Sequence, residues 1–459
     1  MSEVVFDKDL IKRYDKAGPR YTSYPTAVQF TEHFSEADYL NQANASNNGN
    51  PPLSLYFHIP FCDTVCYYCG CNKVVTKNRS RAEPYLQRLH KEIELQSKLF
   101  SKDRMVEQLH WGGGTPTFIS HDEMRALMQE TRTYFNLRDD DSGEYSIEVD
   151  PREAHGDTIA VLREIGFNRI SLGVQDFEPA VQKAVNRIQS EEETRYVIDK
   201  AREEGFKSTS IDLIYGLPFQ SEKSFDHTLD KIIDIDPDRL SIFNYAHLPE
   251  LFKPQRRINE ADLPSADEKL AILQHSIDKL KSAGYVYIGM DHFAKPDDEL
   301  AIAQKNNSLY RNFQGYSTHA DCDLVAMGIT SISKVANCYS QNIKSMDEYN
   351  AAIDANKLAV MRGIVLDDDD VLRREVINQL ICHFALSFTQ IEEKFGIEFK
   401  TYFAKELELL KTMQTDGLVE LDSNHIQVTP AGNLLIRNIC MTFDKYLQTN
   451  KEQRFSKVI

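Results

Sequence analysis

Residues 53–69 decide how this chain is interpreted, and they read Leu53-Ser54-Leu55-Tyr56-Phe57-His58-Ile59-Pro60-Phe61-Cys62-Asp63-Thr64-Val65-Cys66-Tyr67-Tyr68-Cys69. The first seven residues predict a strand, and three cysteines follow with the spacing C-x-x-x-C-x-x-C. Three thiolates on one short loop can hold three irons of a four-iron cluster and leave the fourth iron without a protein ligand. An open metal position is where chemistry takes place. The pattern therefore predicts an iron–sulfur cluster whose free iron binds S-adenosylmethionine.

Two other uses of these cysteines fit less well. A structural zinc site normally pairs C-x-x-C with a second group of Cys or His, and the sequence has no such second pair. A disulfide framework is typical of small secreted domains rather than of 459 residues without a signal peptide. The remaining cysteines stand singly, as free thiols in protein cores do: Cys322, Cys338, Cys382 and Cys440.

Composition narrows the class of protein. Hydrophobic residues make up 41% and charged residues 27%, which is ordinary for a globular protein. The formal net charge of −17 argues against nucleic-acid binding, which needs a basic stripe. No window approaches eighteen uncharged apolar residues, and residues 1–13 lack the apolar core of a signal peptide. We therefore expect a cytoplasmic protein without a membrane span.

Strands and helices alternate through the first two thirds of the chain. Strands are predicted over 53–59, 108–111, 145–149, 169–174, 208–215, 239–245 and 286–290, and helices over 82–100, 121–135, 157–165, 191–204, 224–233 and 266–283. This alternation requires right-handed parallel crossovers, so the class is α/β, as a barrel or an open doubly wound sheet. In either fold ligands bind at the carboxyl ends of the strands. The candidate site residues fall there: the cysteine loop, Gly112–Gly114, Glu148, Gln175, Asp212, Ala246 and His247.

The two ends of the chain differ from this middle part. Residues 1–50 show little periodicity and contain Pro19-Arg20-Tyr21-Thr22-Ser23-Tyr24-Pro25-Thr26, which predicts an extended N-terminal arm over the core. Beyond 364 helices dominate, over 371–384, 388–395 and 399–413, followed by a hairpin at 418–421 and 426–428 and a helix from 431. We expect an arm at 1–50, a catalytic barrel at 51–364 and a mostly helical, winged-helix-like domain at 365–459.

Single residues leave alternatives open. The run Gly112-Gly113-Gly114-Thr115-Pro116 lets backbone approach a ligand closely, or it is merely a tight turn. Glu148 ends a strand and could bind a ribose hydroxyl or an ammonium group, or form a salt bridge or helix cap. Asp212 lies in an apolar strand, where an unpaired charge is expensive, so it needs a partner from the protein or a ligand. Gln175 and Arg187 are less informative by chemistry alone.

The cysteine loop with Tyr56 resembles the radical S-adenosylmethionine superfamily, and the whole chain resembles the family of oxygen-independent coproporphyrinogen III oxidases. The likeness is carried by Pro19–Thr26, Tyr56–Asn72 (with Cys71), His110–Thr117, Ile147–Arg152, Gly289–Ala294 and Asn312–Tyr316. It implies a partial (β/α) barrel of the radical S-adenosylmethionine type. It also implies one [4Fe-4S] cluster on Cys62, Cys66 and Cys69, with Tyr56 as a further catalytic residue and Cys71 not a ligand.

The same resemblance implies two S-adenosylmethionine molecules. The first chelates the open iron near residues matching Tyr56, Gly113, Glu148 and Ile332. The second lies near matches to Tyr68, Gly114, Thr115, Gln175, Arg187, Asp212 and Ala246.

The implied activity is the decarboxylation of two propionates of coproporphyrinogen III to vinyl groups by means of a 5′-deoxyadenosyl radical, which gives protoporphyrinogen IX. The enzyme is expected to be a monomer that takes electrons from a flavodoxin or ferredoxin, and Arg20 is a candidate partner for a substrate carboxylate. The alternative is a haem chaperone of the same superfamily, because a shared fold does not fix function.

Overall fold

The computed structural model describes residues 4–447, so the first three residues of the predicted arm and the last twelve of the predicted C-terminal domain lie outside it. The chain divides into two compact units. One contains residues 30–272 and 321–365, and we call it the barrel unit. The other contains residues 1–29, 273–320 and 366–459, and we call it the terminal unit. The predicted boundaries at 50 and 364 remain predictions.

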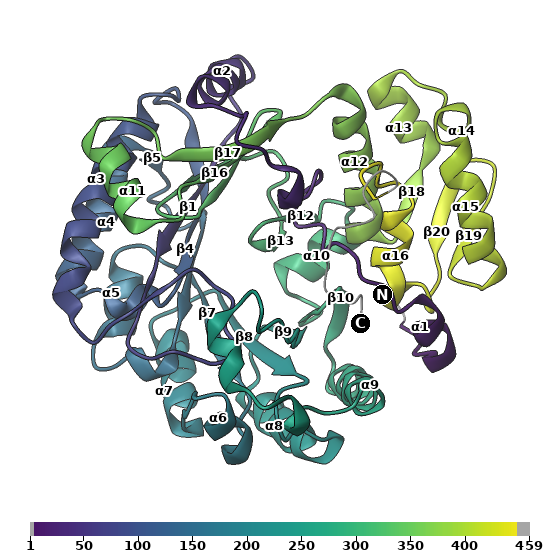
Figure 1. Ribbon diagram of the computed structural model, residues 1–459, viewed down its shortest axis with the longest axis horizontal. Helices are drawn as coiled ribbons and strands as arrows, with labels where there is room; N and C mark the ends of the chain where they lie inside the picture. The colour runs from purple at the N-terminus through teal and green to yellow at the C-terminus, as the bar shows by residue number, and fades with distance from the viewer. Residues whose placement is uncertain (1–3, 448–459) are drawn as a thin grey trace. The chain divides into compact units, whose positions relative to one another are not determined.

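The barrel unit is built on a curved sheet (Figure 1). Six strands lie side by side in chain order and run parallel: β1 (Leu53–Ile59), β4 (Met105–Gly113), β6 (Glu144–Val149), β7 (Arg169–Gln175), β8 (Ser208–Tyr215) and β9 (Arg239–Asn244). A sheet whose neighbours follow the chain order is wound in one direction. The structure therefore confirms a partial barrel and not a doubly wound sheet.

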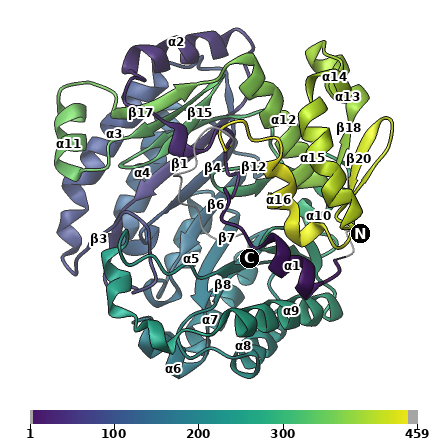
Figure 2. The same cartoon turned by 45° about the vertical axis from the view of Figure 1, so that its right-hand side comes forward.

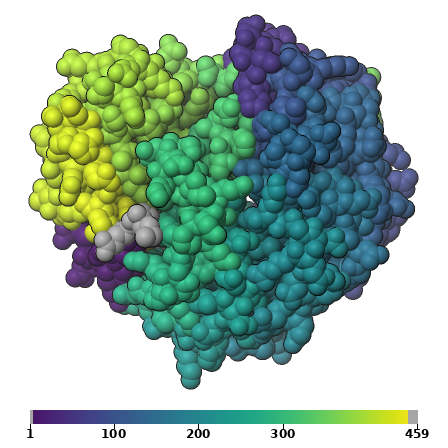
Figure 3. All heavy atoms as spheres, turned by 180° about the vertical axis from the view of Figure 1, so that it is seen from behind, coloured from purple at the N-terminus to yellow at the C-terminus, as the bar shows by residue number. Residues whose placement is uncertain are grey.

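Amphipathic helices cover the outer side of this sheet (Figures 1 and 2). They are α3 (Glu83–Ser97), α4 (His121–Tyr134), α5 (Thr158–Glu164), α6 (Pro179–Ala184), α7 (Glu191–Glu203) and α8 (Glu222–Ile235). Ser120, Ser190 and Ser221 begin α4, α7 and α8 with side-chain caps that close the first helical turn. Seen from behind, the blue and teal residues of this unit form a continuous surface of side chains (Figure 3).

Part of the barrel unit was not predicted from the sequence. Strand β14 (Asp323–Met327) adds to the free edge of β1 in parallel, and β15 (Ile332–Val335), β16 (Cys338–Asn342) and β17 (Val360–Val365) extend it antiparallel. These strands are short, and only long-range pairing with β1 makes them a sheet. Helices α2 (Glu36–Asn47) and α11 (Met346–Asp354) and the short strands β2 (Phe61–Cys62), β3 (Val74–Val75) and β5 (Asn136–Leu137) complete the unit. Helix α9 (Ala266–Ser282) spans the boundary at 272.

The terminal unit is mostly helical. Its helices are α1 (Lys8–Tyr14), α10 (Glu299–Lys305), α12 (Asp368–His383), α13 (Phe388–Phe395), α14 (Phe399–Tyr402), α15 (Ala404–Thr415) and α16 (Ile436–Met441). Its strands are β10 (Val286–Gly289), β11 (His292–Ala294), β12 (Tyr310–Asn312), β13 (Gly315–Ser317), β18 (Ala385–Ser387), β19 (Val419–Leu421) and β20 (His425–Val428). The predicted hairpin is β19–β20, and β18 adds a third antiparallel strand to it.

One predicted helix is broken. The sequence predicts a helix over 399–413, but Phe403 has φ −102° and ψ 27° and separates α14 from α15. The Phe403 ring is fully buried and packs on Phe399 and Phe443. Burial of this aromatic side chain offsets the lost helical geometry.

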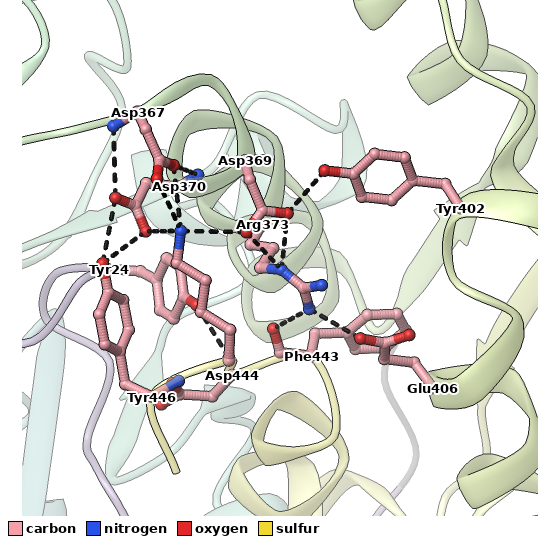
Figure 4. Close-up of polar contacts among 11 residues, drawn as sticks. Tyr24, Asp367, Asp369, Asp370, Arg373, Tyr402, Glu406, Phe443, Asp444 and Tyr446 are labelled. Atoms are coloured by element: carbon pink, nitrogen blue, oxygen red, sulfur yellow. Dashed lines mark hydrogen bonds and ion pairs between the residues drawn. The ribbon is translucent and has the colours of Figure 1, made fainter. Parts of the chain in front are cut away.

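Contacts within the terminal unit tie the start of the described chain to its end. Tyr21 donates a hydrogen bond to Asp444, and the buried Arg437 donates to the carbonyls of Gly18 and Pro19. Near them the ammonium of Lys445 lies 3.0 Å or less from carboxylates at the start of α12 (Figure 4). Residues 18–24 are therefore an ordered part of this unit.

Candidate active site

The cysteine loop leaves the carboxyl end of β1 and is held from several sides. Cys62 lies in β2, and its register partner in β3 is Val75. The next residue, Thr76, donates from its backbone N to Cys62 O at 2.9 Å. Tyr67 N donates to the carbonyl of Val185 at 2.9 Å. Because the loop is anchored by backbone bonds on either side of Cys66, its three thiols have fixed directions.

The three thiols line one cavity of about 250 Å³ at the carboxyl ends of the barrel strands. Most of the residues predicted from the sequence line the same cavity: Cys62, Cys66, Tyr68, Cys69, Gly113, Gly114, Thr115, Glu148, Gln175, Arg187 and Asp212. Tyr56, Ala246 and Ile332 are not among its lining residues. The parallel sheet explains the convergence, since side chains at the carboxyl ends of neighbouring strands share one edge.

Hydrogen-bond donors surround the sulfur atoms. Thr115 Oγ1 lies 3.6 Å from Cys62 Sγ. Arg187 Nη1 lies 3.5 Å and Arg152 Nη2 3.8 Å from Cys66 Sγ. Two guanidinium groups at one sulfur can balance the negative charge of an iron-bound thiolate.

Asp150 holds these two arginines in place. Its Oδ2 lies 2.6 Å from Arg152 Nη2 and 3.0 Å from Arg187 Nη1, and all three side chains are largely buried. Burial acts to raise the pKa of Asp150, but Arg187 and then Arg152 outweigh it and lower that pKa to about 2. The group thus carries a net positive charge beside Cys66 at neutral pH.

The other two thiols differ in pKa. Burial raises the pKa of Cys62 to about 11. A hydrogen bond from Cys71 and the charge of Lys73 together lower the pKa of Cys69 to about 5, against the effect of burial. Lys73 Nζ also donates to the backbone carbonyls of Cys69 and Cys71, at 3.2 and 3.3 Å. Cys71 therefore acts on Cys69 through a hydrogen bond.

Glycines bring the backbone of β4 against the loop and against Glu148. A Cβ on Gly114 would lie 2.7 Å from backbone atoms of Pro60 and Phe61, so only glycine fits there. Gly113 has φ +120°, and its N–H donates to Glu148 Oε2 at 3.1 Å. The run is therefore a close approach of backbone to the site.

Glu148 is a carboxylate that faces the cavity, and its side chain is about half exposed (48%). Burial acts to raise the pKa of Glu148, but His110, 3.4 Å away, and the N–H of Gly113 outweigh it and lower that pKa. An ionised carboxylate in a cavity can bind an ammonium group or ribose hydroxyls.

Asp212 has partners within the protein. Ser171 Oγ lies 3.4 Å from its Oδ2, and Ser241 is its register neighbour on β9. Burial raises the pKa of Asp212 to about 6, against the hydrogen bonds from Ser241 and Ser171 that lower it. The prediction that Asp212 needs a partner is met by two serines, which leaves carboxylate lone pairs for a ligand in the cavity.

Tyr56 and His58 connect β1 with the loop. His58 Nε2 lies 3.1 Å from the carbonyl of Asn72, so it donates there, and Nδ1 accepts from Tyr56 OH at 3.2 Å. Burial lowers the pKa of His58, which keeps the ring neutral. Tyr56 also stacks on His110, with ring centroids 5.8 Å apart. Tyr56 thus packs on His110, which in turn lies 3.4 Å from Glu148 in the wall of the cavity.

Sequence reasoning assigned no role to four of these residues. Ser241 is found only by its register with Asp212, and Ser171 only by its hydrogen bond to that carboxylate. Asp150 and Arg152 lie in the segment Ile147–Arg152 that carries the family likeness, but their pairing across Cys66 needs the fold. Arg20 lies in the terminal unit and is described below.

The donor set fits a three-cysteine iron–sulfur cluster. Three thiols, with cations and hydroxyls directed at their sulfurs, stand in one cavity, and all eight cysteines of the chain are free. A fourth cysteine, Cys71, forms a hydrogen bond with Cys69. No helix among residues 4–447 is long and apolar enough to cross a membrane.

Comparisons with known proteins extend this picture. The Radical SAM superfamily model matches residues 56–232, and the model of the HemN C-terminal domain matches 366–435. The chain is 55% identical to the oxygen-independent coproporphyrinogen III oxidase of Pseudomonas aeruginosa and 51% identical to that of Escherichia coli, in both cases over 100% of each chain. A solved structure of coproporphyrinogen III oxidase (HemN) from Escherichia coli, described as a radical SAM enzyme, aligns with TM-score 0.92 and 50% identity over 97% of this chain and 100% of that one.

Proposed function

The chain belongs to the family of oxygen-independent coproporphyrinogen III oxidases, and from that premise we propose that it converts two propionate side chains of coproporphyrinogen III to vinyl groups, giving protoporphyrinogen IX. Each conversion removes one β-hydrogen atom, one electron and carbon dioxide from a –CH2–CH2–COO⁻ group. The observation that carries the proposal is the placement of Cys62, Cys66 and Cys69 in one cavity with Glu148 and Asp212. Full-length similarity to named oxidases favours this activity over haem delivery.

We propose Cys62, Cys66 and Cys69 as the ligands of one [4Fe-4S] cluster. With S-adenosylmethionine the cluster supplies a 5′-deoxyadenosyl radical, the species able to take hydrogen from an unactivated carbon. The protein's own contribution is to hold the thiols in fixed directions, to balance their negative charge with Arg152 and Arg187, and to shape the cavity.

We propose that the cavity serves two S-adenosylmethionine molecules. The first would lie near Tyr56, Gly113, Glu148 and Ile332, where the Glu148 carboxylate accepts from a ribose hydroxyl or the methionine ammonium group. The second would contact Tyr68, Gly114, Thr115, Gln175, Arg187, Asp212 and Ala246. The separation of Glu148 and Asp212 on different strands of one cavity supports two acidic binding positions.

The partners and compartment are proposed on chemical grounds. The reaction needs a one-electron donor, such as a flavodoxin or ferredoxin, to reduce the cluster. Eight free cysteines suit the reducing cytoplasm, where thiols stay reduced. We propose that the protein works there as a monomer, because all the residues assigned to the cluster come from one chain.

An anaerobic assay tests the activity. Cluster-loaded protein is given dithionite, S-adenosylmethionine and coproporphyrinogen III, and protoporphyrinogen IX and 5′-deoxyadenosine are followed. We expect two 5′-deoxyadenosines per protoporphyrinogen, and no product with Cys66→Ala. Tight haem binding with no vinyl product would instead indicate a chaperone.

Titration of S-adenosylmethionine binding tests the two-site proposal. Isothermal titration of cluster-loaded protein is expected to give two molecules per chain, with one of them lost in Asp212→Ala. One molecule per chain for the unaltered protein would reject the second site and leave the activity untouched.

A further inference from the structure

Three of the segments that carry the family likeness do not line the cluster cavity. They are Pro19–Thr26, Gly289–Ala294 and Asn312–Tyr316, and all three lie in the terminal unit. The structure brings them into contact there. Arg20 pairs with Asp291, and the ring of His292 meets that of Tyr316 edge-on, with centroids 5.1 Å apart. Segments nearly 300 residues apart in sequence therefore form one cluster of side chains.

The packing between these segments is close. A Cβ on Gly289, which has φ +145°, would lie 2.4 Å from the hydroxyl of Tyr316. That hydroxyl donates to the carbonyl of Ile381 in α12 at 3.2 Å. The guanidinium of Arg311 lies over the Tyr316 ring, 4.7 Å from the ring centroid. Strand pairing places Arg311 directly opposite Tyr316 in the β12–β13 hairpin. The position of Arg311 is thus fixed by packing rather than by an ion pair.

The cluster contains three arginines, and one of them, Arg20, is paired with a carboxylate. Arg20 Nη1 lies 2.7 Å from Asp291 Oδ2. Arg437 is buried against the carbonyls of Gly18 and Pro19, the residues just before Arg20. Burial, together with the charges of Arg20 and Arg311, lowers the pKa of Arg437 to about 10, whereas Asp291 acts in the opposite direction. These charges are therefore close enough to repel one another.

Arg311 is the unusual member. Only 7% of the residue is exposed, and its Nε and Nη1 are buried without a hydrogen-bond partner among the residues that the structure describes. A buried guanidinium that lacks acceptors loses its hydration without compensation, which is costly. Such a group in a native structure indicates a partner that residues 4–447 do not provide. A carboxylate oxygen satisfies such an N–H group with a charge-assisted hydrogen bond and also balances the charge of the guanidinium.

We propose that Arg311 and Arg20 form a binding site for a carboxylate of the substrate, with Arg437 adding positive charge behind them. The proposal rests on the proposed function, since it takes the ligand to be a propionate of the tetracarboxylate porphyrinogen. Asp291 then occupies Arg20 in the free protein and is displaced or shared when the ligand binds. A ligand contacts Arg20 first, because the side chain of Arg20 is one third exposed (33%) whereas Arg311 is buried.

The bound carboxylate could belong to the porphyrinogen or to a small free anion, and the two differ in the rest of the molecule. A single free carboxylate, such as that of acetate or succinate, would bind here with no need of a macrocycle. A porphyrin propionate arrives with an apolar ring system and three further carboxylates. Binding that depends on the carboxylates and on the ring together identifies the substrate, and binding of succinate alone at similar strength identifies a free-anion site.

The experiment uses the stable oxidised coproporphyrin III and its tetramethyl ester as probes of the full-length, cluster-loaded protein. Binding is followed by porphyrin fluorescence for the unaltered protein, Arg311→Gln, Arg20→Gln and Asp291→Asn. Arg13→Gln is the control, since Arg13 is an exposed arginine of the same unit whose partner is Asp416. We expect Arg311→Gln to weaken coproporphyrin III binding roughly 10- to 100-fold, as loss of charge-assisted hydrogen bonds does.

The other variants make the test directional. Arg20→Gln should weaken binding by a smaller factor, and Asp291→Asn should strengthen it, because the competing carboxylate is gone. The tetramethyl ester should bind the unaltered protein weakly and show no difference among the variants. Equal coproporphyrin III affinity in all variants would overturn the proposal. Displacement of coproporphyrin III by succinate at a similarly low concentration would overturn it as well. If Arg311→Gln does not fold, the opposite signs expected for Arg20→Gln and Asp291→Asn still decide.

Turnover separates this proposal from the proposed function. With active protein, Arg311→Gln should raise KM for coproporphyrinogen III and leave reductive cleavage of S-adenosylmethionine without substrate unchanged. If Arg311→Gln leaves KM unaltered while the protein makes protoporphyrinogen, the arginine site is rejected and the proposed function stands. Tetracarboxylate binding that depends on Arg311 in a protein that makes no vinyl product rejects the proposed function alone.

Discussion

Arg152 donates a hydrogen bond from its Nη2 to the sulfur of Cys66, at a distance of 3.8 Å, from a position that Asp150 fixes at 2.6 Å. A cation beside a thiolate ligand stabilises the more negative, reduced form of a cluster and so raises its reduction potential. The electrostatic environment of the proposed cluster is thus set by a residue outside the cysteine loop.

The first prediction concerns this arginine. Arg152→Gln should lower the reduction potential of the reconstituted cluster, by about 59 mV if the reduction equilibrium changes tenfold. Arg152→Lys should keep most of the potential, and Arg125→Gln, on the surface of α4, should leave it unaltered. Redox titration followed by electron paramagnetic resonance measures all three. An unchanged potential in Arg152→Gln would show that the charge is fully screened by Asp150.

The second prediction distinguishes ligands from neighbouring cysteines. Alanine at position 62, 66 or 69 should abolish most iron and acid-labile sulfide after anaerobic reconstitution, since a three-ligand cluster does not survive loss of one thiolate. Cys71→Ala should keep both, as should Cys440→Ala, which removes a buried thiol of the terminal unit. Iron and sulfide analysis per chain gives the answer. Loss of the cluster in Cys71→Ala would make Cys71 a ligand.

The third prediction tests the close approach of backbone at Gly114. A Cβ there would lie 2.7 Å from backbone atoms that cannot move aside, so Gly114→Ala should displace the cysteine loop. We expect reduced cluster content and at least tenfold lower activity, in a protein whose far-ultraviolet circular dichroism is unchanged. Gly49→Ala is the matched control, because its nearest contact would be an ordinary 3.8 Å. Full cluster content in Gly114→Ala would contradict the argument.

The fourth prediction concerns the pH dependence of stability at Asp212. The pKa of Asp212 is raised by burial from about 3.8 to about 6, so the folded protein holds this proton more tightly than the unfolded chain. Its contribution to stability is therefore full below about pH 4 and lost as the pH rises to 6 and above. Asp212→Asn should stabilise the ligand-free protein at pH 8 by at most about 3 kcal/mol and have little effect at pH 4.

The measurement for Asp212 is the apparent unfolding temperature of the ligand-free protein as a function of pH. Asp122→Asn, at a fully exposed position of α4, should show no such difference. A stabilisation equal at pH 4 and pH 8 would mean that the carboxylate is not desolvated in solution.

The fifth prediction concerns a buried ion pair in the barrel unit. Arg104 Nη2 lies 2.7 Å from Asp323 Oδ2, and both side chains are almost fully buried. Asp323→Ala leaves the guanidinium buried with one partner fewer and should destabilise the fold by about 3–5 kcal/mol. Asp354→Ala removes the exposed partner of Arg88 and should cost less than about 1 kcal/mol. Denaturant unfolding followed by circular dichroism compares the two, and equal effects would refute the distinction.

The order of amino acids was enough to predict the cysteine loop, the parallel strands from β1 to β9 and the position of the site at their carboxyl ends. These features follow from local patterns, namely the spacing of three cysteines and the alternation of strand and helix. It also predicted that Asp212 needs a partner, because the cost of a buried charge depends only on its apolar neighbours in the strand.

The folded structure was needed to show which groups meet across long stretches of chain. The pairing of β14 with β1, the convergence of Arg152 and Arg187 on Cys66, and the cluster of Arg20, Arg311 and Arg437 join residues that are at least 86 positions apart. The physical reason is that strand propensity and periodicity act over a few residues, whereas pairing and charge balance depend on which surfaces the folded chain buries together.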